Sequence, residues 1–199
     1  MLYGIPPHFD DATWESWTPR PELEKAVEVL QRWEGDPPSV LLLSPANGTN
    51  LGTGKTRALC SAVKAWRDRG AKAWYYPVTR IVRIEQQLMD GDHEMYQDEY
   101  GERGSANWCC SAPHMVAFDD LGAEHGSSWS IGLMERIADE RYASDFPTLY
   151  ATNLDERSLQ IRYPRLWRRC TEGLMLAWQA PLFDRRLIRS KGALHVLPI

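Results

Sequence analysis

A short glycine-rich segment, Gly-Thr-Gly-Lys-Thr at residues 52–56, constrains this sequence more than any other feature. The apolar run 40–43 before it predicts a buried strand, and Leu59, Val63 and Trp66 after it recur at helical spacing. Strand, glycine-rich turn and helix in this order are the context of a phosphate-binding loop. Glycine lets backbone N–H groups close around a phosphate, and a helix N-terminus favours negative charge. The segment therefore predicts an α/β fold built around a phosphate-binding site.

The side chains of this segment have distinct predicted roles. Lys55 is expected to reach the β- and γ-phosphates of a nucleotide, and the Thr56 hydroxyl is expected to bind Mg²⁺. The predicted nucleotide-binding residues here are Gly52, Thr53, Gly54, Lys55, Thr56 and Arg57. The full motif has an earlier glycine where this chain has Thr49, so we interpret residues 46–51 as an insertion of undefined role. The alternative is a plain glycine-rich connection, which the flanking strand and helix argue against.

Composition and charge narrow the possible partners. The 199 residues suffice for one domain with a sizeable core, and the net charge of −4 at pH 7 gives no overall attraction to nucleic acid. No apolar run could span a bilayer and no signal-peptide pattern is present, which favours a cytoplasmic protein with reduced cysteines and no membrane association. Cys109, Cys110 and His114 could form a zinc cluster, but a fourth ligand is not evident.

Predicted strands and helices alternate along the chain. Strands are expected at 40–43, 71–78, 114–120, 147–152 and 174–178, with 195–197 as a further edge-strand candidate. Helices are expected from residue 21 and at 79–89, 127–142 and 155–170, and 184–189 is a short basic segment. This order predicts a three-layer α/β sandwich with a mostly parallel five-stranded sheet and little or no separate lid domain. We expect one domain over 21–199, preceded by an extended lead-in over 1–20.

Three polar residues follow two of the later strands. Asp119 and Asp120 end the strand expected at 114–120, and Asn153 ends the next. After a phosphate-binding loop, the first carboxylate is expected to hold Mg²⁺ and the second to polarise an attacking water. The Asn153 amide is expected to orient that water or to contact the γ-phosphate. Taken alone, the carboxylates could equally cap a turn, and Asn153 could be an ordinary turn residue.

The motifs resemble those of AAA+ ATPases of the DnaC/IstB type, which are bacterial and phage helicase loaders and transposon ATPases. The resemblance covers nearly the whole chain, and its motifs are Gly52–Thr56, Phe118–Glu124, Asp139–Tyr142, Pro147-Thr148 and Thr152–Leu154. It implies a P-loop AAA+ fold, ATP and Mg²⁺ as cofactors, and a homo-oligomer formed with ATP. It also implies ATPase activity, with Lys55, Asp120, Asn153 and Arg165 as the catalytic residues.

The resemblance also gives roles to arginines outside the P-loop. Arg165, preceded by Arg162, matches the arginine finger that completes a neighbouring subunit's site, and Arg185 or Arg186 matches the sensor 2 arginine. Arg80 and Arg83 lie where the family's path for single-stranded DNA runs, so they are expected to bind phosphates. The bland alternative for all of these side chains is a solvated basic face.

Several functions remain open at this point. The leading one is an oligomeric ATPase that acts on single-stranded DNA in replication, as a helicase loader or related factor, in phage or mobile-element replication. Only about 20 residues precede the first helix, so we expect an ATPase module without the family's usual N-terminal domain. A replicative helicase or a transposase would be the protein partner. The alternatives are a transposition ATPase acting on duplex DNA, a small-molecule P-loop kinase, and a nucleotide-switched binding module with negligible hydrolysis.

Overall fold

The computed structural model describes residues 4–43, 52–91, 105–124, 126–178, 187–190 and 193–196. Its helices are α1 (Glu24–Arg32), α2 (Lys55–Asp68), α3 (Val78–Met89), α4 (Ala106–Ser111), α5 (Ser128–Ala143), α6 (Glu156–Arg162) and α7 (Pro164–Glu172), with short 3-10 turns at Pro7–Phe9 and Pro21–Leu23. Its strands are β1 (Ser39–Leu43), β2 (Ala73–Pro77), β3 (Met115–Leu121), β4 (Thr148–Thr152), β5 (Leu174–Ala177), β6 (Leu187–Ser190) and β7 (Ala193–Val196).

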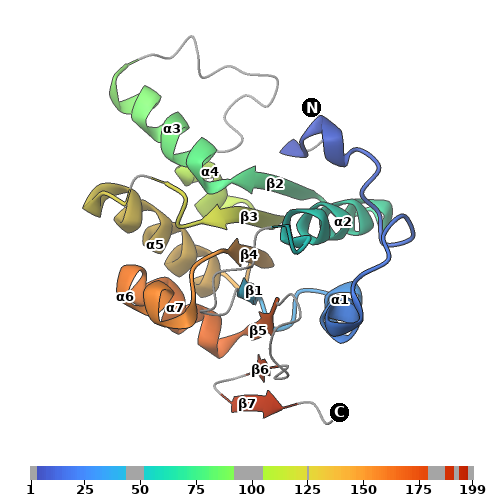
Figure 1. The fold of residues 1–199 in the computed structure, drawn as a ribbon. Coiled ribbons are helices and arrows are strands. Elements are labelled where there is room, and N and C mark those ends of the chain that lie inside the picture. The colour runs from blue at the N-terminus through green and yellow to red at the C-terminus, as the bar shows by residue number, and fades with distance from the viewer. Residues whose placement is uncertain are drawn as a thin grey trace.

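The strands form one sheet in the order β2-β3-β4-β1-β5-β6-β7 (Figure 1). The first five strands of this order are parallel, which confirms the predicted mostly parallel sheet. Two short antiparallel strands, β6 and β7, extend the sheet beyond β5. The interpretation of 184–189 as only a basic segment missed β6, because a four-residue strand at this edge is defined by its pairing with β5 rather than by its own pattern.

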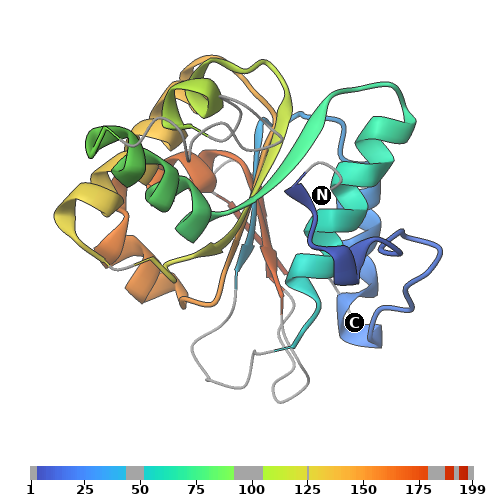
Figure 2. The ribbon, with the colours of Figure 1, turned by 90° about the horizontal axis from the view of Figure 1, so that it is seen from above.

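Helices cover both faces of the sheet, as a three-layer sandwich requires (Figure 2). One apolar core packs α1 and α2 against one face of the sheet. A second packs the five helices from α3 through α7 against the opposite face. Strand β1 is buried along its first four residues because helices cover both faces of the sheet. This burial explains why its sequence is a continuous apolar run rather than an alternating one. Because β1 to β5 are parallel, their carboxyl ends lie at the same edge of the sheet. The P-loop and Asp119 are expected at this edge.

The helix predicted over 155–170 is divided in two. Pro164 begins α7 and has no backbone N–H to continue the hydrogen bonds of α6. A proline also disfavours helical geometry in the residue before it, and Tyr163 accordingly has φ −132° and ψ 65°. The break matters for function because it separates Arg162, the last residue of α6, from Arg165 in the first turn of α7.

The segment before α1 lies against the domain and packs along α2. Ile5 and Ala12 are fully buried in the core on the α2 side. Lys64 of α2 donates hydrogen bonds to the carbonyl oxygens of Phe9 and Asp10. The lead-in thus forms part of the wall around the beginning of α2.

Candidate functional site

The glycine-rich segment has the backbone geometry of a phosphate-binding loop. Gly52 and Gly54 have φ values of 78° and 89°, in the left-handed region where a side chain is strained. A Cβ at Gly54 would also lie 2.9 Å from Cζ2 of Trp17. Gly54 is the N-cap of α2, so Lys55 and Thr56 form the first turn of a helix that points its N-terminus at the site. The predicted insertion at 46–51 lies outside the described residues.

Asp119 connects β3 to this turn. The residue is 2% exposed, and its Oδ2 accepts a hydrogen bond of 2.7 Å from Thr56 Oγ1. The same oxygen accepts a hydrogen bond of 2.7 Å from the Tyr75 hydroxyl of β2, and Oδ1 accepts one of 2.9 Å from the backbone N–H of Asp120. Burial, and then the neighbouring Asp119 carboxylate, raise the pKa of the Tyr75 hydroxyl well above its ordinary value. Three donors therefore hold one buried carboxylate beside the P-loop threonine.

Asp120 and Asn153 are in contact although they lie 33 positions apart in the sequence. Asn153 Nδ2 donates a hydrogen bond of 3.2 Å to Asp120 Oδ1. The register of β3 against β4 shifts between Phe118 and Leu121, and Asp120 has φ 54°, a conformation that few side chains adopt. Burial, and then the adjacent Asp119 charge, raise the pKa of the Asp120 carboxyl. A carboxylate with a raised pKa, next to an amide, is suited to accept a proton from water.

These residues line one cavity of about 390 Å³. Its lining consists of Phe9, Gly52, Thr53, Gly54, Lys55, Thr56, Arg57, Asp119, Asp120 and Asn153. Lys55 is 7% exposed, and its Nζ lies 3.4 Å from Thr53 Oγ1. Burial lowers the pKa of Lys55 to about 8, although Asp119 and Asp120 oppose this shift. A cation, two carboxylates and a helix N-terminus thus face a common space.

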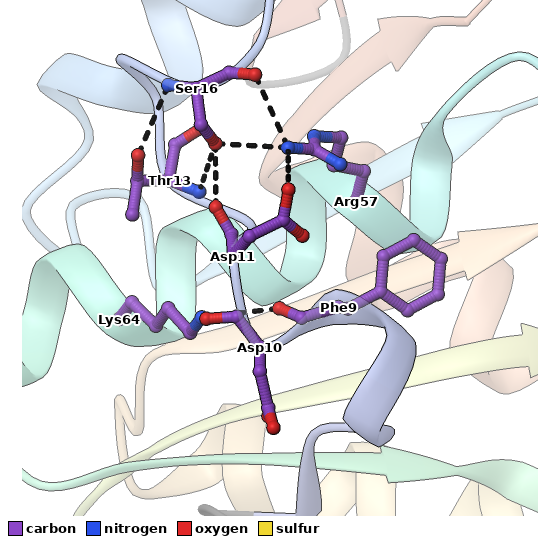
Figure 3. Close-up of polar contacts among 7 residues, drawn as sticks. All are labelled: Phe9, Asp10, Asp11, Thr13, Ser16, Arg57 and Lys64. Carbon is purple, nitrogen blue, oxygen red and sulfur yellow. Dashed lines mark hydrogen bonds and ion pairs between the residues drawn. The ribbon is translucent and has the colours of Figure 1, made fainter.

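Arg57 was predicted to bind nucleotide, and its guanidinium contacts the lead-in (Figure 3). Its Nη2 lies 3.2 Å from Asp11 Oδ2 and donates a hydrogen bond of 2.9 Å to Ser16 Oγ. It also lies 3.3 Å from the Ser16 carbonyl oxygen. Since Arg57 lines the cavity as well, its role toward a nucleotide stays a prediction.

The predicted arginines outside the P-loop lie in different settings. The Arg162 guanidinium donates to the carbonyl oxygens of Gly122 and Glu124 at 2.9 and 2.8 Å, so it braces the loop after β3. Arg165 has a side chain that is 71% exposed and does not line the cavity of its own chain. On α3, Arg83 is exposed and Arg80 is partly buried. The two sensor 2 candidates, Arg185 and Arg186, lie outside the described residues.

Sequence reasoning missed three aromatic residues around the site. Phe9 of the lead-in lines the cavity, and Tyr75 contacts Asp119 as described above. Trp178, just after β5, donates a hydrogen bond of 3.0 Å from Nε1 to the Thr53 carbonyl oxygen, and its ring stacks on Trp17. The nine tryptophans of the chain were a signal that some would have such roles, but nothing in the sequence indicates which.

The donor set fits a Mg²⁺ ion better than a zinc ion. Thr56 and Asp119 offer a hydroxyl and a carboxylate oxygen, and Mg²⁺ in phosphate-binding sites takes few protein ligands besides the phosphates. Within the described ranges no group of three or more His, Cys, Asp or Glu side chains could hold a metal ion, which removes Cys109, Cys110 and His114 as a cluster. Burial raises the pKa of the Cys109 thiol to about 12, as expected for an inert core cysteine.

Known structures show the same arrangement of elements. No protein-family model and no curated protein matches the sequence. A crystal structure of the DnaC helicase loader matches with a TM-score of 0.67 and 18% identity over 87% of this chain and 100% of that chain. The replication initiator DnaA bound to AMPPCP and single-stranded DNA matches with a TM-score of 0.67 and 17% identity, over 88% of this chain and 51% of that chain. The chain has the fold of a P-loop AAA+ domain.

Three further observations concern a third matching structure, the length covered and the helices. A crystal structure of DnaI matches with a TM-score of 0.55 and 19% identity, over 83% of this chain and 89% of that chain. The chain spans about half the length, 49% to 51%, of three of the replication-initiation chains it matches, two of which are DnaA bound to AMPPCP. None of the helices that the structure describes combines the length and apolar character needed to cross a bilayer. The fold implied by the resemblance to DnaC-type proteins is thereby confirmed.

Proposed function

We propose that this AAA+ domain binds ATP with Mg²⁺ and hydrolyses it. The observation that carries the proposal is the 2.7 Å contact between Thr56 and Asp119, beside Lys55 in one cavity. It joins the phosphate-binding turn to the carboxyl end of β3, which is the pairing that holds Mg²⁺ in P-loop enzymes. DnaA bound to AMPPCP, an ATP analogue, shares the fold.

Each polar side chain of the cavity has a task in this proposal. The Gly52–Gly54 backbone and Lys55 bind the phosphates, and Thr56 and Asp119 hold the metal ion. The ion would neutralise phosphate charge when bound with the nucleotide. Asp120 accepts a proton from the attacking water, and Asn153 fixes the Asp120 carboxylate through the 3.2 Å hydrogen bond. Arg165 has no place in the cavity of its own chain, so it acts on the site of a neighbouring subunit in an oligomer.

The replacement Lys55→Ala tests this activity. We expect it to weaken ATP binding and to abolish hydrolysis, because Lys55 is the cation proposed to contact the β- and γ-phosphates, whereas the Arg57 guanidinium contacts Asp11 and Ser16. Lys72→Ala, which alters an exposed lysine before β2, is the matched control and should change neither quantity. Binding is measured with a fluorescent ATP analogue and hydrolysis by phosphate release. Undiminished turnover in Lys55→Ala would rule out this assignment.

We further propose that the protein acts on single-stranded DNA in replication as a helicase loader or related factor. The likeness to the DnaC helicase loader along that chain's whole length supports this role. Arg83, exposed on α3, and the partly buried Arg80 beside it are the candidate phosphate contacts. Protein–phosphate contacts release counterions, so DNA affinity should fall steeply with salt.

The double variant Arg80→Ala/Arg83→Ala tests the DNA contact. We expect weaker binding to single-stranded DNA and a smaller salt slope, by about one unit for each lost phosphate contact. Arg32→Ala is the control, because Arg32 is a 79% exposed arginine on α1. Helix α1 covers the face of the sheet opposite to α3, so the control lies far from the proposed DNA contact. An unchanged affinity and slope would exclude the α3 surface. Preference for duplex over single-stranded DNA would instead favour a transposition ATPase.

A further inference from the structure

Asp119 receives hydrogen bonds from two side chains, and only one of them belongs to a predicted motif. Thr56 Oγ1 and the Tyr75 hydroxyl both lie 2.7 Å from the same oxygen, Asp119 Oδ2. Thr56 is itself a proposed metal ligand, so its hydroxyl has two tasks. Tyr75 comes from β2, lies in no nucleotide-binding motif and does not line the cavity.

The sheet fixes where the Tyr75 side chain lies. Tyr75 pairs with Ala117 of β3, and Pro77 pairs with Asp119, so the Tyr75 ring runs along the sheet toward the carboxylate two positions ahead. Side chains alternate between the faces of a strand. Tyr75 accordingly belongs to the core on the α2 side, whereas its neighbours Trp74 and Tyr76 belong to the opposite core.

Tyr75 is buried, and the lead-in packs against its backbone. The Tyr75 side chain is 3% exposed within the α2-side core. Gly4 of the lead-in approaches its backbone so closely that a Cβ at Gly4 would lie 2.0 Å from the Tyr75 carbonyl oxygen. Because Tyr75 is buried, its hydroxyl has a fixed position. A donor of fixed position is suited to orient a carboxylate that binds a metal ion.

We propose that Tyr75 is a positioning residue whose hydroxyl holds the Asp119 carboxylate in the orientation needed to bind Mg²⁺ together with the nucleotide. The inference rests on the proposed ATP and Mg²⁺ binding, and it adds a residue that neither the motif nor the cavity lining includes. Partners that hydrogen-bond to metal ligands commonly change metal affinity about 10- to 100-fold when removed. Tyr75 is the side-chain donor to Asp119 that is not itself a proposed metal ligand.

The variant Tyr75→Phe tests the proposal, since it removes the hydroxyl and keeps the ring. The measurement is the affinity for a fluorescent ATP analogue as MgCl₂ is titrated, and again in EDTA. We expect the half-saturating Mg²⁺ concentration to rise about 10-fold and the affinity in EDTA to stay unchanged. Both values come from one sample, so a partly unfolded variant would reduce the signal amplitude but not shift the ratio between them.

Two comparison variants make the outcome specific. Tyr76→Phe removes a hydroxyl from the next residue of β2, on the opposite face of the sheet, and should leave the Mg²⁺ dependence unchanged. Asp119→Asn should remove that dependence. If Asp119→Asn acts as expected and Tyr75→Phe matches the native chain, the role of Tyr75 is wrong and the metal site stands. If Asp119→Asn also leaves the dependence unchanged, the proposed metal site itself fails.

Discussion

Arg141 and Lys55 are both buried cations, but the chain surrounds them in different ways. Arg141 of α5 is 0% exposed, and its guanidinium donates to the Thr148 hydroxyl and to the carbonyl oxygens of Cys109, Ala112, His114 and Pro147. Lys55 borders the cavity together with Asp119 and Asp120, and burial lowers its pKa to about 8. Neutral oxygens of the chain itself accept the hydrogen bonds of the Arg141 guanidinium. Lys55 instead borders a cavity that could hold a ligand.

The difference separates a structural cation from a functional one. A buried cation with every nearby acceptor supplied by the fold ties elements together, and here Arg141 joins the ends of α4 and α5 to β3 and β4. Burial lowers the pKa of both Arg141 and Lys55, so the pKa shift alone does not distinguish them. Lys55 differs because it borders a cavity in which a ligand could compensate the cost of its burial. Substitutions in the two regions should therefore affect different properties.

The largest expected effect tests whether the cavity around Lys55 needs a residue from a neighbouring subunit for ATP hydrolysis. If it does not, the contrast between an open functional region and a self-contained structural one fails. Arg165 lies outside that cavity, so Arg165→Ala should reduce the ATPase rate per subunit by about 10³-fold or more if the arginine acts in trans. The native rate per subunit should rise with protein concentration, and with single-stranded DNA. Arg168→Ala, which removes a 75% exposed arginine from the same helix, serves as the control. A rate that ignores both concentration and Arg165 would favour a kinase or a switch.

The Arg141 region should respond in stability instead. Arg141→Ala leaves four carbonyl oxygens and a hydroxyl without their buried donor, so we expect the free energy of unfolding to fall by about 3–5 kcal/mol. Urea denaturation measures it, and Arg136→Ala, an exposed position on the same helix, should change it little. A stable Arg141→Ala protein that no longer binds nucleotide would reverse the roles assigned to the two cations.

The sequence could predict the residues whose neighbours are set by local pattern and sheet order. The P-loop comes after β1 in the sequence, Asp119 and Asp120 lie near the carboxyl end of β3, and Asn153 follows β4. These positions can be read from strand ends alone, because parallel pairing brings such ends together.

Residues whose position depends on packing between distant segments could not be predicted. Trp178 reaches Thr53 across 125 positions, and Phe9 reaches the cavity because the lead-in folds back along α2. Helix α4 was also missed, since residues 90–112 show little periodicity. Motif matching places Arg141 and Arg162 in family patterns, but it does not reveal that both donate mainly to backbone carbonyl oxygens.

The smallest expected effect is a gain in stability when the buried charge of Lys55 is removed, and it tests directly whether that charge is costly to bury. Lys55→Met removes the buried charge and keeps an unbranched side chain, so without nucleotide it should stabilise the protein at pH 7. Full conversion of a shift from 10.5 to about 8 would give about 3 kcal/mol. We expect about 1–2 kcal/mol, because the cavity admits water and its carboxylates support the ammonium.

The pH dependence of that gain identifies its source. The folded-state pKa of Lys55 lies below the 10.5 of an ordinary lysine, so folding disfavours the charged form. The cost to the native chain is fully present below pH 8 and shrinks as the pH rises from about 8 to 10.5, where the folded chain releases the proton first. The stability difference between Lys55→Met and the native chain, from urea denaturation at each pH, should narrow across this window. A difference that stays constant with pH would mean that the methionine improves packing, and Lys55 would then carry no stored electrostatic cost.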